Sequence, residues 1–137
     1  MIVTAQDPHQ LEMSLDAYMS EVDLACKKTR ELLVGAGLEG RLFDVILVLR
    51  EALNNAIRHG NRCTEGKRVS CRCRLEGNDL AIEIEDEGEG FDWMPCLDRQ
   101  PEAVSECGRG MSIMRMYTTS MEFNGKGNRL TLRMRMG

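Results

Sequence analysis

Residues 69–86 read Val-Ser-Cys-Arg-Cys-Arg-Leu-Glu-Gly-Asn-Asp-Leu-Ala-Ile-Glu-Ile-Glu-Asp, and this stretch decides the fold. Apolar side chains alternate with polar ones on both sides of Gly77-Asn78, a pair that is typical of a tight turn. Because successive side chains of a strand point to opposite faces, the stretch predicts a β-hairpin with one buried face. The same parity places Asp86 on the apolar face of the second strand, together with Leu80, Ile82 and Ile84.

Two amphipathic helices are predicted before this hairpin. Apolar residues recur at the helical period from Tyr18, and Gly35 and Gly37 are expected to end the first helix. A stronger stripe, which ends near Gly60, marks the second helix: Leu42, Val45, Ile46, Leu49, Leu53, Ala56 and Ile57. Residues 11–15 alternate as a short strand, whereas residues 1–10 are polar and are expected to be flexible.

The chain after the hairpin begins with residues 87–109, which have no clear periodicity. A loop of this length in a small domain is uncommon unless it has a function. A short helix at 110–117 and two strands at 119–124 and 129–136 complete the pattern. Because strands and helices both carry one apolar face, the fold class is α+β, a two-layer sandwich. If the strands are neighbours, the outer face is a ladder of opposite charges: Arg72, Arg74, Glu83, Glu85, Arg133 and Arg135.

Length and composition narrow the class of protein. A chain of 137 residues suits one domain, and 18 basic against 22 acidic residues give a net charge of −4. This charge and an aromatic content of 4% argue against direct nucleic-acid binding. The longest apolar run, residues 45–49, is too short to span a membrane, and no secretory signal is evident, so we expect a cytoplasmic protein. The six cysteines lack metal-binding spacing and are expected to be reduced core thiols, with a metal site as the minor alternative.

Two short motifs combine carboxylates with amides or glycines. Glu51 and Asn55 share one face of the second helix, where a carboxylate can act as a general base and an amide oxygen can bind Mg²⁺. Asp86 is followed by Gly88 and Gly90, so its carboxylate could accept a hydrogen bond from an adenine amino group while the glycines allow close approach. A helix surface pair and a glycine-rich turn are the ordinary structural explanations of these two motifs.

The third motif is Gly108-Arg109-Gly110-Met111, which precedes the short helix. Free amides at a helix N-terminus form a natural phosphate site. A lone Gly-x-Gly is weak evidence, and the chain has no Walker A motif. The order of the three motifs along the chain is therefore more specific than any one of them.

This order resembles the GHKL ATPase superfamily, over about residues 15–136. Residues 51–61, Glu-Ala-Leu-Asn-Asn-Ala-Ile-Arg-His-Gly-Asn, look most like the serine-kinase anti-sigma factors of that superfamily. The resemblance implies a single histidine-kinase-like ATPase domain over residues 1–137. It also implies a mixed, mainly antiparallel sheet with about three helices on one face, and ATP and Mg²⁺ as cofactors.

The resemblance also implies a role for each motif residue. Asn55 would bind Mg²⁺ on the ATP phosphates, and Glu51 would be the base that activates a serine hydroxyl of a protein substrate. Asp86 would accept the adenine amino hydrogen, and Gly88 and Gly90 would shape the pocket wall. The phosphates would be wrapped beneath an ATP lid at 91–107 by Gly108, Arg109, Gly110 and Met111.

The function implied is that of a homodimeric serine protein kinase that binds a sigma factor and phosphorylates a STAS-type anti-anti-sigma protein. The alternative is a non-catalytic regulatory module that binds a nucleotide or a partner. The chain departs from the superfamily at the opening of its last strand, where Asn128 follows Gly127 in place of the usual Thr that supports the adenine-binding Asp. Either Asn128 substitutes for that Thr or adenine binding is weaker.

Overall fold

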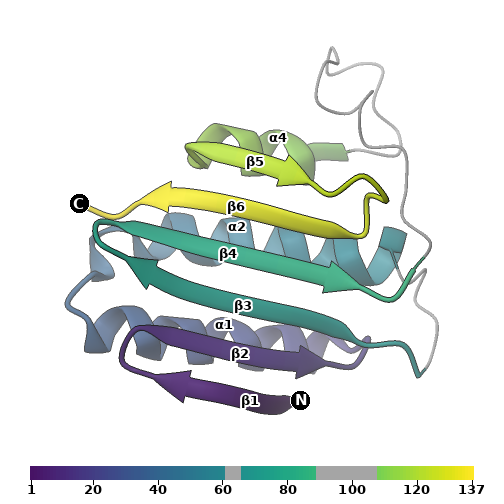
Figure 1. Ribbon diagram of the computed structural model, residues 1–137, viewed down its shortest axis with the longest axis horizontal. Coiled ribbons are helices and arrows are strands. Elements are labelled where there is room, and N and C mark those ends of the chain that lie inside the picture. The colour runs from purple at the N-terminus through teal and green to yellow at the C-terminus, as the bar shows by residue number, and fades with distance from the viewer. Residues whose placement is uncertain (61–65, 89–107) are drawn as a thin grey trace.

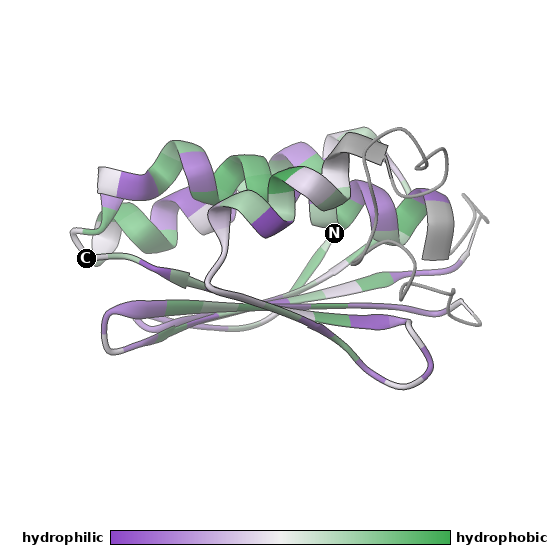
Figure 2. Ribbon diagram, turned by 90° about the horizontal axis from the view of Figure 1, so that it is seen from above, coloured by the Kyte–Doolittle hydropathy of each residue, from purple (hydrophilic) through white to green (hydrophobic). Residues whose placement is uncertain are grey.

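The computed structural model describes residues 1–60, 66–88 and 108–137. A twisted six-stranded sheet and a layer of helices lie face to face, with the helices on one face of the sheet only (Figures 1 and 2). This arrangement confirms the predicted two-layer α+β sandwich.

The elements follow the chain in a simple order. The first half contains β1 (Ile2–Asp7), β2 (Gln10–Leu15), α1 (Met19–Gly35), the 3₁₀ turn η1 (Glu39–Arg41), α2 (Leu42–Asn55) and the π-helical turn η2 (Ala56–Gly60). The second half contains β3 (Val69–Glu76), β4 (Asp79–Asp86), α4 (Gly108–Tyr117), β5 (Ser120–Phe123) and β6 (Arg129–Arg135).

The strand order in the sheet is β1-β2-β3-β4-β6-β5. The five pairings between these strands are all antiparallel, so the described part of the sheet has no parallel pair, although a mixed sheet was expected. The last strand, β6, lies between β4 and β5, and this brings the β5–β6 turn beside the end of β4 (Figure 1).

Residues 1–10 were expected to be flexible, and no separate strand was predicted there, whereas Ile2–Asp7 form the edge strand β1. This strand pairs with β2 but has no buried side chain, so it lacks the apolar alternation by which strands are recognised. Smaller differences concern boundaries. The helix α4 begins at Gly108 instead of residue 110, and β5 is shorter than the predicted 119–124.

The β3–β4 hairpin has the predicted parity. Its inward side chains are buried against the helices: Val69, Cys71, Cys73, Leu80, Ile82 and Ile84. Asp86 follows them on the same face and is also buried, with 7% of its surface exposed. The hairpin therefore delivers a carboxylate to the rim of the hydrophobic core.

Arg41, which precedes α2, connects the helical layer to the sheet. Its guanidinium donates to the main-chain oxygens of Arg135, at the end of β6, and Tyr117, at the end of α4, over 2.7 and 3.3 Å. Asp44 holds the same guanidinium through an ion pair of 3.1 Å. These contacts tie the start of α2 to the end of α4, so the two helices have a defined position relative to each other.

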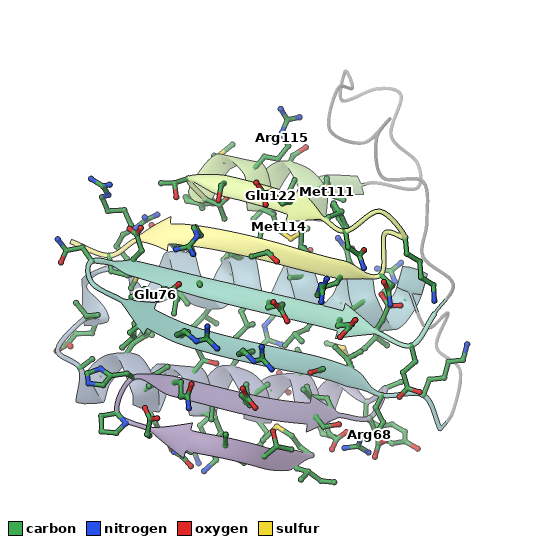
Figure 3. The ribbon with its side chains drawn as sticks, in the orientation of Figure 1. Arg68, Glu76, Met111, Met114, Arg115 and Glu122 are labelled. Atoms are coloured by element: carbon green, nitrogen blue, oxygen red, sulfur yellow. The ribbon has the colours of Figure 1, made fainter. Side chains whose placement is uncertain are left out.

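The outer face of the sheet carries the predicted charge ladder. The guanidinium of Arg72 lies between Glu12 on β2, at 2.7 Å, and Glu83 on β4, at 3.8 Å. Arg133 pairs with Glu76, which Figure 3 labels on β3, at 3.2 Å. Exposed ion pairs contribute less than about 1 kcal/mol each. This face is therefore a solvated one rather than a basic patch.

The described cysteines agree with the thiol prediction. Cys26, Cys71 and Cys73 are free and buried in the core between α1 and β3. Cys63, Cys96 and Cys107 lie outside the described residues. Among the described helices, none has the length and apolar character needed to cross a membrane.

Candidate functional site

The helix α2 supplies the first two candidate residues. One side of α2 is buried in the core through Val45, Val48, Leu49, Ala52 and Leu53. Glu51 and Asn55 lie on the neighbouring side and are half-buried. The α-helical hydrogen bonding ends at Asn55, and the chain continues as the wider turn η2. Such π-helical turns occur often at functional sites, because they shift the direction of side chains next to them.

The first turn of α4 lies directly against these two side chains. A Cβ atom placed on Gly110 would be 2.7 Å from Oε2 of Glu51, and 3.5 and 3.6 Å from the amide nitrogen and oxygen of Asn55. A side chain at position 110 would have to push the Glu51 carboxylate aside. The structure therefore joins the first and third motifs, which are far apart in the sequence.

Asp86 ends β4 at the edge of the core. One of its carboxylate oxygens accepts a hydrogen bond of 2.8 Å from the N–H of Gly88. Burial raises the pKa of the Asp86 carboxyl above its ordinary value, because the charged form loses solvation, and the Gly88 N–H opposes this shift. Ionised Asp86 is thus a buried charge whose carboxylate can accept a further hydrogen bond. A carboxylate in this state is expected where a ligand supplies the hydrogen-bond donor.

A small pocket that is partly open to solvent connects Asp86 to the helix α2. Two groups of residues line it. The polar or glycine residues are Asn55, Asp86, Gly127 and Asn128, and the apolar ones are Ala52, Ala56, Ile84, Phe123 and Leu130. A mostly apolar cleft with a few polar groups is the usual form of a small-molecule site. Asn55 belongs both to this pocket and to the contact with Gly110.

The turn between β5 and β6 forms one wall of the pocket. Asn128, the residue expected to replace a Thr of the superfamily, donates from its side-chain amide to the main-chain oxygen of Asp86 over 3.1 Å. Asn128 therefore does contact Asp86, but through the main chain and not through the carboxylate. The effect of this replacement on adenine affinity stays a prediction.

The remaining predicted residues have different outcomes. Gly88 is buried beside Asp86. Gly108 and Arg109 begin α4, although the Arg109 side chain lies outside the described part. The Met111 side chain is buried in the core with Met114, whereas Arg115 points outward from the same helix (Figure 3). Met111 can therefore serve a ligand only through its main chain. Gly90 and the proposed lid at 91–107 lie outside the described residues.

The apolar lining of the pocket was not predicted from the sequence. Ala52, Ile84 and Leu130 have the same periodic pattern as core residues, so no local signal separates pocket from core. Phe123 ends a four-residue strand that is too short to show alternation clearly. Its position beside Leu130 depends on the β5–β6 pairing.

A metal site made by protein ligands alone is not present in the described ranges. No group of three or more His, Cys, Asp or Glu side chains there is arranged to hold an ion. Mg²⁺ in nucleotide sites commonly has one or two protein ligands and takes the rest from phosphates and water. The single amide oxygen of Asn55 fits that type of site.

Comparison with known proteins agrees with this arrangement. The histidine kinase-like ATPase domain family matches residues 15–135. The chain belongs to this family. It is similar to proteins named anti-sigma F factor: one from Clostridium perfringens strain SM101 is 28% identical over 103 residues, covering 69% of this chain and 73% of the relative. Another, from Clostridium kluyveri strain ATCC 8527, is 29% identical over 95 residues, covering 66% of each chain.

The contact at Gly110 predicts a selective effect in this ATPase domain. In Gly110→Ala, the new methyl group must displace the Glu51 carboxylate, which is the flexible end of a side chain. Alanine favours a helix over glycine by about 1 kcal/mol, so the stability to urea should be equal or higher. Because the methyl group would also occupy the space between Asn55 and the α4 amides, where the phosphates and Mg²⁺ are expected to bind, we expect ATP affinity, measured by calorimetry, to fall at least about tenfold. Gly40→Ala, in the turn η1 and without near contacts, is the control. Unchanged ATP affinity in Gly110→Ala would contradict the placement.

The raised pKa of Asp86 predicts a change in stability with pH. Between the ordinary value of 3.8 and the raised pKa, the unfolded chain ionises before the folded one, so stability falls as the pH rises through this window. Asp86→Asn removes the charge and keeps an oxygen for the Gly88 N–H. It should resist urea better than the wild type at pH 7, with the difference vanishing at acidic pH. Its ATP affinity should fall by about tenfold or more.

Asp79→Asn is the control for this experiment, because Asp79 begins the same strand and only pairs with exposed Arg135 at 3.9 Å. A lower stability of Asp86→Asn than of the wild type at pH 7 would show that the carboxylate is not strained by burial.

Proposed function

We propose that this chain is an ATP-dependent protein serine kinase that acts as an anti-sigma factor. One observation carries the proposal. Glu51 and Asn55 meet the first turn of α4 at Gly110, and Asn55 also lines the pocket that contains Asp86. A carboxylate that can bind the adenine ring (Asp86), a helix N-terminus that can bind phosphates (α4) and a carboxylate that can act as a general base (Glu51) thus belong to one continuous site.

The pocket supports binding of the adenine base. Its walls at Ala52, Ile84 and Leu130 are apolar and suit a flat ring, while the Asp86 carboxylate accepts a hydrogen bond from an amino group. Because one carboxylate oxygen is already bonded to the Gly88 N–H, the other oxygen remains for the ligand. An amino group at one position of the ring matches this single acceptor.

The first turn of α4 supports binding of the phosphates. The first amides of a helix lack partners within it, and the helix dipole adds positive potential there. The absence of a side chain at Gly110 brings these amides close to Asn55. Asn55 would hold Mg²⁺ through its amide oxygen.

Glu51 would act as the general base. When bound, ATP would supply the phosphoryl group and Mg²⁺ would offset its negative charge. Glu51 would accept the proton of the serine hydroxyl on the protein substrate, which raises the nucleophilicity of that oxygen. Half-buried and next to the first turn of α4, its carboxylate lies one helical turn from Asn55.

The partners of this proposal are a sigma factor and a STAS-type anti-anti-sigma protein, the latter being the substrate. The similarity to proteins named anti-sigma F factor supports the first partner. The resemblance of residues 51–61 to serine-kinase anti-sigma factors supports the second. A non-catalytic nucleotide-binding module is the alternative, and Glu51 argues against it, because binding alone does not require a base.

The proposed homodimer has a candidate surface at the edge strand β1. Its outer edge contains neither Lys nor Pro, which commonly protect exposed edges. Ile2, Tyr18 and Met19 are 56%, 55% and 56% exposed. The ion pair of the Met1 ammonium with Glu21 brings the start of β1 beside the first turn of α1, so these apolar groups lie at one end of the molecule. Two copies could pair their β1 strands antiparallel about a twofold axis.

The kinase proposal predicts a separation of binding from catalysis. Glu51→Gln keeps the size of the side chain but removes the base. We expect ATP affinity to stay within about threefold, and phosphorylation of STAS-domain proteins of the same organism, measured with labelled ATP, to fall about 10²–10⁴-fold. Asn55→Ala should instead lose Mg²⁺-dependent ATP binding.

Glu39→Gln, in the exposed turn η1, is the matched control and should behave as the wild type. Full kinase activity in Glu51→Gln would exclude Glu51 as the base. If the wild type labels none of the STAS-domain proteins while binding ATP, the non-catalytic module replaces the kinase.

The dimer proposal is tested through the edge strand. Ile2→Lys places a charge at the exposed edge and should shift the chain from dimer to monomer in light scattering, with little change in stability. Leu24→Lys, at another exposed apolar position on α1, should leave the oligomeric state unchanged. A wild type that is monomeric at all concentrations would overturn the dimer.

A further inference from the structure

The turn between β5 and β6 is organised by one asparagine side chain. The side-chain oxygen of Asn124 accepts hydrogen bonds from the N–H groups of Gly127, Asn128 and Arg129, over 2.8, 3.0 and 3.1 Å. Gly127 has a φ of +83°, a conformation that favours glycine. The turn is therefore closed by its own side chain and has little freedom to change shape.

A second asparagine transmits this order to the end of β4. The side-chain amide of Asn124 donates to the side-chain oxygen of Asn128 over 2.7 Å, which fixes the orientation of the Asn128 amide. The Asn128 nitrogen then points to the main-chain oxygen of Asp86, at 3.1 Å. The N–H of Asp86 donates in turn to the main-chain oxygen of Asn128, over 2.9 Å.

Asp86 is thus held at both of its main-chain polar groups by one residue. A third hydrogen bond, from Gly88, holds its carboxylate. The polar atoms of the Asn128 side chain are both used in this network, while Gly127 and Asn128 form the pocket wall facing Asp86. The wall and the carboxylate therefore move as one unit, at the point where β4 ends.

From this network we propose that Asn124 and Asn128 are positioning residues that aim the Asp86 carboxylate at the amino group of the bound base. The inference rests on the proposed function, since it presumes that Asp86 accepts a hydrogen bond from the nucleotide. A hydrogen bond weakens steeply when its angle departs from linearity, so the aim of the carboxylate sets its contribution. Loss of the Asn128 amide should consequently reduce the selectivity for the amino group more than the binding of the rest of the nucleotide.

The experiment compares two nucleotides by calorimetry in the presence of Mg²⁺: ATP, and purine riboside 5′-triphosphate, which lacks only the 6-amino group. In the wild type, we expect ATP to bind tighter by about tenfold or more, because the hydrogen bond is made to a charged group. In Asn128→Ala, the preference for ATP should fall about threefold or more. The affinity for the purine analogue should stay within about twofold of the wild type.

Asn128→Asp is the second variant, in case Asn128→Ala folds poorly. It keeps the size of the side chain and an oxygen for the Asn124 amide, but it cannot donate to Asp86, so the same loss of preference is expected. Asn78→Ala is the matched control. Asn78 lies in the β3–β4 turn at the other end of β4, and its substitution should leave both affinities unchanged.

The outcomes separate this inference from the proposed function. A wild type that binds the two nucleotides equally would overturn base recognition by Asp86 and the positioning role with it. A wild type that prefers ATP, with an unchanged preference in both Asn128 variants, would overturn only the positioning role. An equal loss of affinity for both nucleotides would show that Asn128 has a merely structural role in the pocket, and would also overturn it.

Discussion

The alternation of side chains along β4 is the constraint on which the rest of this structure depends. β4 lies between β3 and β6, and its inward residues Leu80, Ile82 and Ile84 pack beneath the helices. The same alternation carries Asp86 to the inner face, although its burial opposes ionisation and raises the pKa of the carboxyl. A shift of one residue in register would turn the apolar set to solvent, so the hydrophobic core also secures the direction of this carboxylate.

The helix α2 has a comparable double role. Its buried stripe holds the helix against the sheet, and the adjacent side of the same helix presents Glu51 and Asn55 at the rim of the core. Arg41 ties the start of α2 to the end of α4, and Gly110 lets the other end of α4 touch both side chains. The candidate catalytic arrangement is therefore secured by packing and hydrogen bonds at both ends of a pair of helices.

The pocket lies where several elements end. The last residues of β4 and α2 and the β5–β6 turn meet there, and Asn55 also contacts the first turn of α4, whereas the middle of each element serves the core (Figure 1). Side chains at element ends can contact a ligand without opening the core, because their main-chain groups are already partly free of regular hydrogen bonding. Asn124 and Asn128 use side-chain hydrogen bonds to give this region the order that regular pairing provides elsewhere.

Local patterns in the sequence determined the elements that have a buried face. The hairpin of β3 and β4, the helices α1 and α2, the inward parity of Asp86 and the shared helical side of Glu51 and Asn55 all follow from periods of two or 3.6 residues. These features depend on neighbours within a few positions. A single sequence is therefore sufficient to predict them.

Only the tertiary structure decided which residues that are distant in the sequence become neighbours. The edge strand β1 has no buried face and is a strand because β2 is there to pair with it. Phe123 and Leu130 line a pocket, and not simply the core, because β6 lies between β4 and β5. The contact of Gly110 with Glu51, and the hydrogen bond from Asn128 to Asp86, join residues separated by 59 and 42 positions. No local period encodes such contacts, since they form only when the packed core brings distant element ends together.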